Sequence, residues 1–118
     1  MNVHARPVVA AVAAALVNGR PYTNVLDHSR TGNVRISAKV EGETVEAYDH
    51  SRGHHVTGAL PNGVYHHGDA AHIAFTRVGD TVTGYHHGDQ THFEAKVKGG
   101  EVTLFDHGPS QHFKFTVG

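Results

Sequence analysis

A repeat of about 20 residues is the feature that most constrains how this chain folds. The segment Tyr65–Ile73 recurs twenty positions later as Tyr85–Phe93, and twenty further on as Phe105–Phe113. Variants of the same motif occupy Tyr48–Val56 and, in degenerate form, Leu26–Val34. A repeat this short cannot bury its apolar side alone, so the copies predict a series of similar units around one core.

The segments between these motifs alternate apolar and polar residues and are bounded by Gly, Asn and Asp turns, which is typical of β-hairpins. We therefore expect an all-β fold: an antiparallel meander of about nine short strands, closed as a curled sheet, a sandwich or a barrel. The expected strands are 33–40, 44–50, 54–60, 63–67, 72–78, 81–87, 92–98, 101–107 and 112–117.

The N-terminal segment predicts a single helix over residues 5–19, ahead of hairpin repeats over 26–118, in one domain that spans 1–118. Pro7 lies in its first turn and Gly19 follows its end, as helix termini prefer. Its apolar run is too short to span a bilayer, so we expect no membrane span. The alternative is a signal peptide, because Arg6 precedes small apolar residues; the protein would then be exported.

Alternate residues of each expected strand point to opposite faces of the sheet. One face is therefore apolar and forms the core, and the other faces solvent. Nine strands side by side would make an apolar face about 40 Å wide, which one short helix covers only in part. Curling, or packing on another copy, must bury the rest, and a meander also leaves two open edges. We therefore expect a homo-oligomer. The core face collects Val34, Ile36, Ala38, Val40, Val45, Ala47, Val56, Leu60, Val64, Ile73, Phe75, Val82, Phe93, Ala95, Val97, Val102, Leu104, Phe113, Phe115 and Val117.

Composition narrows the classes of function. The net charge of −1 gives no basic face for nucleic acid, so we expect no nucleic-acid partner. The absence of cysteine excludes disulfides, thiolate metal sites and cysteine nucleophiles, and it fits a cytoplasmic protein. We find no nucleophile elbow and no phosphate-binding loop, and therefore expect no enzyme. Gly68, Gly88 and Gly108 recur at one turn position, which we interpret as a requirement of backbone conformation.

Histidine is the outlier of the composition, with thirteen residues. Eight of them form four His-x-x-x-x-His pairs, and we expect the members of each pair to face each other across a loop at one margin of the sheet. Two imidazoles so placed suit zinc, nickel or copper, although no cofactor is required; the alternative is that they are structural rungs. His54, His66 and His86 fall on the opposite parity and are expected to be exposed turn residues. The candidate metal ligands are His50, His55, His67, His72, His87, His92, His107 and His112.

An aromatic strip runs beside the histidines and is the second candidate site. It consists of Tyr48, Tyr65, Tyr85 and Phe105, each two residues before the first histidine of a pair. Such rings can stack on sugar rings or on a partner surface. The alternative is that they only shield their own sheet.

Three functions from different classes remain open on the sequence. The first is a self-associating β-repeat protein with a structural or assembly role. The second is a metal-binding or pH-responsive protein, because thirteen histidines change the net charge strongly between about pH 7 and about pH 5. The third is a carbohydrate-binding or protein-binding module that uses the aromatic strip.

Overall fold

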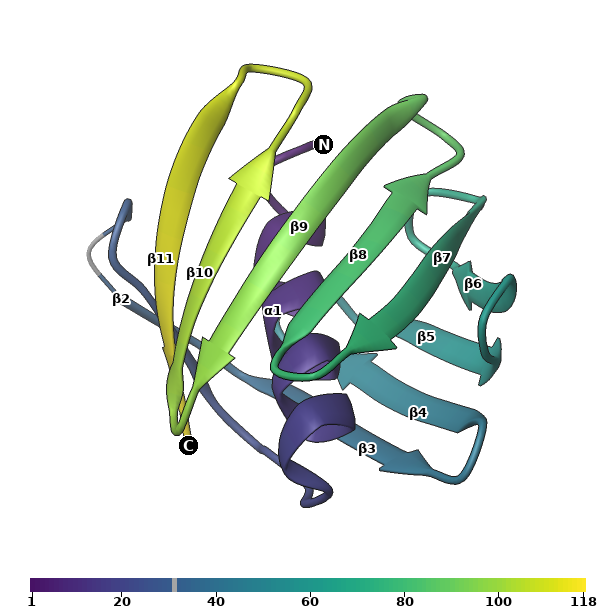
Figure 1. Ribbon diagram of the computed structural model, residues 1–118, viewed down its shortest axis with the longest axis horizontal. Helices are drawn as coiled ribbons and strands as arrows, with labels where there is room; N and C mark the ends of the chain where they lie inside the picture. Colours follow the sequence, from purple (N-terminus) through teal and green to yellow (C-terminus); the bar gives the residue numbers. More distant parts are fainter. Residues whose placement is uncertain (31) are drawn as a thin grey trace.

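The computed structural model describes residues 1–30 and 32–118, and it confirms the all-β meander with one N-terminal helix (Figure 1). The helix α1 spans Ala5–Asn18. The strands are β1 Val25–Asp27, β2 Gly32–Val34, β3 Ile36–Glu41, β4 Thr44–Asp49, β5 His54–Ala59, β6 Gly63–His66, β7 Ala71–Val78, β8 Thr81–His86, β9 Thr91–Lys98, β10 Glu101–Asp106 and β11 Gln111–Val117.

From β3 to β11 each strand pairs antiparallel with the next, as the hairpin repeats predict. The nine expected strands correspond to these elements, except that the first is divided at Arg35 into β2 and β3. That division has a structural reason, since β2 pairs with β1 whereas β3 pairs with β4. The strand β1 lies in the degenerate first copy, and the sequence pattern did not reveal it.

The sheet curls into a nearly closed cylinder, and the segment after the helix closes it. Tyr22 exchanges two backbone hydrogen bonds with Ala38 of β3, at 2.9 and 2.8 Å. One residue further on, the Thr23 N–H donates to the Gly118 carbonyl at 2.8 Å, and β1 then pairs with β11. One extended stretch therefore joins the first strand of the meander to the last.

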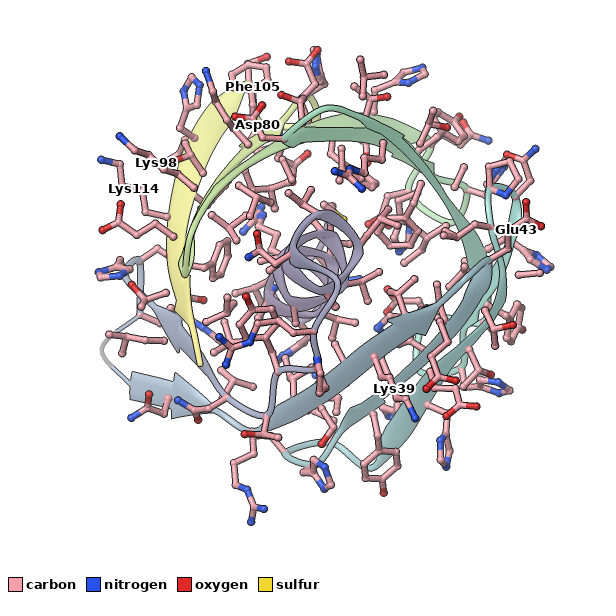
Figure 2. The ribbon with its side chains drawn as sticks, turned by 60° about the horizontal axis from the view of Figure 1, so that its bottom comes forward. Lys39, Glu43, Asp80, Lys98, Phe105 and Lys114 are labelled. Carbon is pink, nitrogen blue, oxygen red and sulfur yellow. The ribbon has the colours of Figure 1, made fainter. Side chains whose placement is uncertain are left out.

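The helix runs through the middle of this cylinder, as an end-on view shows (Figure 2). Val8, Val9 and Val12 are fully buried, and so is every alanine from Ala10 to Ala14. A helix that is apolar on all sides requires burial on all sides, and the curved sheet provides it. Of the two expected ways to bury the rest of the apolar face, curling of the sheet is therefore confirmed, and the curled sheet surrounds the helix.

The alternation of apolar and polar residues correctly identified the core. Every residue assigned to the core face is buried or packs against the buried cluster, with Val34, Val40 and Leu60 the partly exposed ones. The largest buried side chains include Phe75 and Phe93, whose rings meet edge to face with centroids 5.7 Å apart.

The nearly closed sheet also weakens both reasons for expecting a homo-oligomer. The apolar face is already buried by the helix, and the two ends of the meander are joined through the closing segment. Self-association stays a prediction that this fold no longer requires. The segment of the signal-peptide alternative forms the centre of the core, and that alternative stays an untested prediction.

Among the described residues, no helix has the length and apolar character needed to cross a membrane.

We expect Phe93→Ala to lower the free energy of unfolding by about 3–5 kcal/mol, because it leaves a cavity between the sheet and the helix. Urea denaturation monitored by far-UV circular dichroism measures this change. Val78→Ala is the control: Val78 is 70% exposed, so its truncation is expected to change stability by less than about 0.5 kcal/mol. Equal effects of the two substitutions would contradict the assigned core.

Candidate functional site

The histidines gather at one end of the cylinder, the end at which the helix begins. The loops 50–53, 67–70, 87–90 and 107–110 lie there, each joining the two strands of one hairpin. We call this the histidine end. Its outer surface and its inner rim carry different side chains.

On the outer surface, the predicted pairing of histidines across each loop is wrong. His55 lies opposite Tyr48, not opposite His50, and the other three repeats show the same register. The first histidine of each pair lies in the loop and not in the strand ladder. The opposed pairs are Tyr48 with His55, Tyr65 with His72, Tyr85 with His92, and Phe105 with His112.

Each aromatic ring of the strip is therefore flanked by the two histidines of its own repeat. Tyr48 contacts His50 edge to face, with ring centroids 4.7 Å apart, and contacts His55 at 4.5 Å. The corresponding distances in the other three repeats lie between 4.6 and 4.9 Å. The histidines are exposed and the aromatic residues are half-buried, so the strip and the histidines form one surface.

Neighbouring repeats also meet through their histidines. The His67 N–H donates to the His55 carbonyl at 2.9 Å, and the two rings lie 6.4 Å apart. His92 and His107 repeat this contact, with rings 6.5 Å apart. Between the second and third of these repeats, the His87 N–H donates to the His72 carbonyl at 2.9 Å. We call the exposed histidines and aromatic rings of the four repeats the ring belt. It consists of Tyr48, His50, His55, Tyr65, His67, His72, Tyr85, His87, His92, Phe105, His107 and His112.

The ring belt does not assemble a metal site from its own pairs. An aromatic ring separates the two histidines of each repeat. In the described part of the chain, no three His, Cys, Asp or Glu side chains are grouped so that they could hold a metal ion. Binding of zinc, nickel or copper by the eight candidate histidines therefore stays a prediction.

The inner rim of the histidine end is a site that sequence reasoning missed. The residue just before the first histidine of each repeat points into the cylinder, where it is at most 3% exposed. His66 and His86 are two of these residues, so the expectation that they are exposed turn residues is wrong; His54 is half-buried. We call this the inner position, and its five occupants are Asp27, Asp49, His66, His86 and Asp106.

The occupants of the inner position bind the loop that follows them. Asp49 accepts the Ser51 N–H at 3.0 Å through Oδ1, and Asp106 accepts the Gly108 N–H at 2.9 Å. In the two histidine copies, Nδ1 takes the place of the carboxylate oxygen. It accepts the N–H of Asp69 at 3.0 Å on His66, and a matching bond at 3.1 Å forms on His86.

These bonds fix the tautomer of both histidines, because a backbone N–H can only donate. Nδ1 of His66 and of His86 must be unprotonated, and the proton of the neutral ring lies on Nε2. On His86 this Nε2–H donates to Asp69 Oδ2 at 2.9 Å. Among the described residues, none accepts a hydrogen bond from His66 Nε2, which is buried.

The recurrent loop glycines also serve the inner position, which corrects their interpretation as a requirement of backbone conformation. Gly68, Gly88 and Gly108 are absent from the positive-φ residues, whereas Ala70, Gln90 and Ser110 have φ between 51° and 55°. A Cβ at Gly88 would lie 3.0 Å from the His86 ring, so glycine at this place lets the loop pack directly on the inner side chain.

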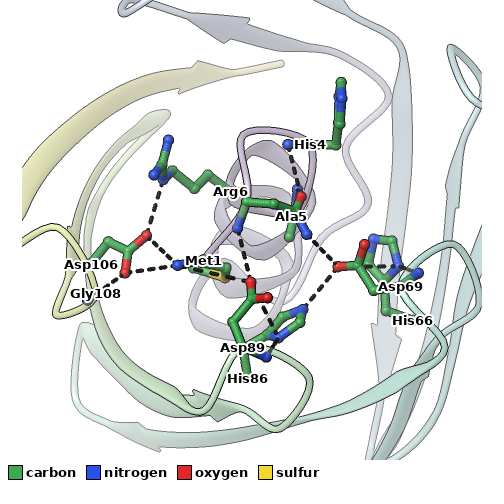
Figure 3. Close-up of polar contacts among 11 residues, drawn as sticks. Met1, His4, Ala5, Arg6, His66, Asp69, His86, Asp89, Asp106 and Gly108 are labelled. Atoms are coloured by element: carbon green, nitrogen blue, oxygen red, sulfur yellow. Dashed lines mark hydrogen bonds and ion pairs between the residues drawn. The ribbon is translucent and has the colours of Figure 1, made fainter.

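A chain of hydrogen bonds connects the inner rim to the start of the helix (Figure 3). Asp69 Oδ2, which accepts from His86, also accepts from Asn2 Nδ2 at 2.9 Å. The Asn2 side chain in turn accepts the N–H groups of His4 and Ala5 at 3.0 and 2.9 Å, where the helix begins. The loops of the two histidine repeats therefore hold the cap of the helix.

Like Asp69, Asp106 is a carboxylate of the inner rim that binds the N-terminal segment, and its side chain is fully buried. Its Oδ2 lies 2.9 Å from the Met1 nitrogen and 3.0 Å from Arg6 Nε. Burial by itself would raise the pKa of Asp106, but hydrogen bonds from Met1, Gly108 and Arg6 outweigh it and hold the pKa below its ordinary value.

The same balance governs Asp69. Burial would raise its pKa, but the hydrogen bonds from Asn2 and His86 and the adjacent histidines lower it. Burial lowers the pKa of His66; the Asp69 carboxylate opposes this, while His86 and His54 add to it. The rim thus favours ionised carboxylates at Asp69 and Asp106 and a neutral imidazole at His66.

Comparison with known proteins adds no family to this description. No protein-family model matches the chain, and no curated protein or solved structure shows significant similarity to it.

We expect Asp106→Asn to lower the free energy of unfolding at neutral pH by about 1–3 kcal/mol, because Arg6 loses a charged partner. The pKa of Asp106 is depressed in the folded state, so its contribution is present above about pH 4 and is lost as pH falls further. Urea denaturation should therefore show that the gap between variant and parent narrows toward about pH 3. Asp80→Asn, at an exposed turn, is the control and should leave stability nearly unchanged at both pH values.

Proposed function

We propose that this chain is a non-enzymatic, pH-responsive histidine-rich protein, whose histidine end is held together at neutral pH and loosens as the pH falls. The single observation that carries the proposal is the use of His66 and His86 where three other repeats use aspartate. All five residues accept an N–H from their own loop, but only an imidazole Nδ1 changes from acceptor to donor when it takes up a proton.

Protonation changes the hydrogen-bonding role of Nδ1 from acceptor to donor. An imidazolium at His86 would place an N–H against the Asp89 N–H, so the bond that holds loop 87–90 would break. The same holds for His66 and loop 67–70. Because Asp69 also holds Asn2, the loss would extend to the cap of the helix.

The burial of His66 gives the sign of the effect. Its pKa is lowered in the folded state, so the unfolded chain binds more protons between the lowered pKa and the ordinary one. Stability therefore falls as the pH drops through this interval. The charged and titratable groups that face the two histidines are Asp69, Asp89 and, for His66, His54. Behind them, the Met1 nitrogen lies 4.0 Å from Asp89 Oδ2 and pairs with Asp106, which also pairs with Arg6.

The ring belt would act in the same direction. Eight exposed histidines lie along one margin, and two pairs from neighbouring repeats have rings within about 6.5 Å of each other. Their protonation would accumulate like charges on this margin, which destabilises it. The experiment must therefore separate the inner histidines from the outer ones.

Amide hydrogen exchange followed by NMR provides that separation within one molecule. Between about pH 7 and about pH 5, we expect the amides of Asp69 and Asp89 to lose protection about tenfold. The amides of Ser51 and Gly108, whose acceptors are aspartates, should keep their protection over the same range. Protection factors, rather than raw rates, remove the intrinsic pH dependence of exchange.

The matched variant is the double substitution His66→Asn and His86→Asn, since an asparagine oxygen accepts the loop N–H at every pH in the range. It should abolish the selective loss of protection. Equal loss in all four loops would trace the effect to the ring belt, and no loss would show that the inner histidines do not respond; either result would contradict the proposal.

A further inference from the structure

Three open hollows lie on the outer face of the sheet, and each contains one aromatic ring of the ring belt with its opposed histidine. The first, of about 620 Å³, contains Tyr48 and His55. The second, of about 360 Å³, contains Tyr85 and His92. The third, of about 370 Å³, contains the equivalent pair from the last hairpin, Phe105 and His112. The same pair thus recurs at equivalent places of three repeats.

The first two hollows exist because small residues lie beside the rings. Tyr85 lies opposite Ala74, and Gly84 lies in the floor between them. Gly84 shares the parity of the buried Val82 and His86, so its missing Cβ leaves room for the Phe93 ring directly beneath this hollow. Tyr48 similarly lies opposite a small residue, Ser37.

Polar groups of both signs line the hollows. Lys39 and Glu46 line the first, and Glu94 and Lys96 line the third. Glu94 also lines the second, so the second and third hollows adjoin. Lys39 and Phe105 both lie on the outer side of the ring of strands (Figure 2). A ligand that fits such walls needs hydrogen-bond donors and acceptors and little net charge.

Pyranose sugars combine these properties in one molecule. One face of the ring carries C–H groups that pack on an aromatic face, and the edge carries hydroxyls that both donate and accept. Carboxylates accept from such hydroxyls, ammonium groups donate to them, and threonine hydroxyls do both. We propose that the three hollows bind neutral oligosaccharides, with Tyr48, Tyr85 and Phe105 each stacking on one sugar ring.

The repetition of the hollows points to a polymer rather than a single sugar. Repeated subsites on one rigid sheet let successive units of one chain bind together, and linked weak contacts give a much tighter whole. Because the second and third hollows share Glu94, adjacent parts of one chain can occupy both. This inference concerns the outer face and does not depend on the proposed pH response of the inner rim.

Affinity electrophoresis at neutral pH tests the proposal with soluble glucan, mannan, galactan and xylan as the probes. We expect at least one of these polymers to retard the protein. Tyr85→Ala and Phe105→Ala should each weaken that retardation about threefold to tenfold, and the double variant should weaken it more than either. Lys98→Ala, an exposed residue at the opposite end of β9, is the control and should bind as the parent does.

Glu94→Gln provides a test that leaves the aromatic rings in place. Glu94 is exposed, so its substitution should not disturb folding, and it should weaken binding at the second and third hollows together. Far-UV circular dichroism and the urea midpoint verify that each variant is folded. Failure of all four neutral polymers to retard the protein would overturn the proposal. Retardation that the ring variants and Glu94→Gln leave unchanged would overturn it equally.

Discussion

The burial of a helix that has no polar side governs the rest of this fold. A helix with one apolar stripe can rest on a sheet, but α1 exposes almost no side chain between Ala5 and Ala15. The sheet must therefore surround it, and a series of short hairpins curls readily because each strand is twisted against the next. The closing contacts between Tyr22 and Ala38, and between β1 and β11, are consequences of that requirement.

Wrapping a sheet around a helix gives each repeat an inside and an outside at the histidine end. The same hairpin then supplies a buried inner residue and an exposed pair of histidines beside an aromatic ring. The inner residue acts on its loop and on the helix cap, whereas the outer rings face solvent. The proposed acid response and the proposed sugar contacts therefore arise from opposite sides of the same repeated segment, and they can vary independently.

Much of the fold could be predicted from the sequence, because side-chain alternation and turn residues encode strands directly. The core residues from Ile36 to Val117 followed from parity alone. The position of the helix was missed although its composition indicated it: no charged residue interrupts Pro7–Val17, which excludes a wetted side. The inner position was also within reach, since Asp49, His66 and Asp106 share the parity of the core.

The register of the histidine loops could not be predicted, and the reason is conformational. The last loop residue has positive φ in each of these repeats, and it is Gly53 in one but Ala70, Gln90 and Ser110 in the others. Alanine, glutamine and serine rarely adopt a left-handed backbone, so the sequence gives no sign of it at these positions. The expected turns were therefore one residue later than the observed ones. That error placed the first histidine of each pair at the end of an expected strand, opposite the second, whereas the structure has it in the loop.

The closing of the sheet through β1 and β11 has a consequence for how the chain reaches its structure. The first strand to be synthesised pairs with β2 on one side, but its partner on the other side, β11, is complete only about ninety residues later. Until then the apolar helix and the inner faces of the earlier hairpins have no finished enclosure. Assembly must therefore end with a single long-range docking step, which makes the C-terminal hairpin the element that commits the molecule to its native topology.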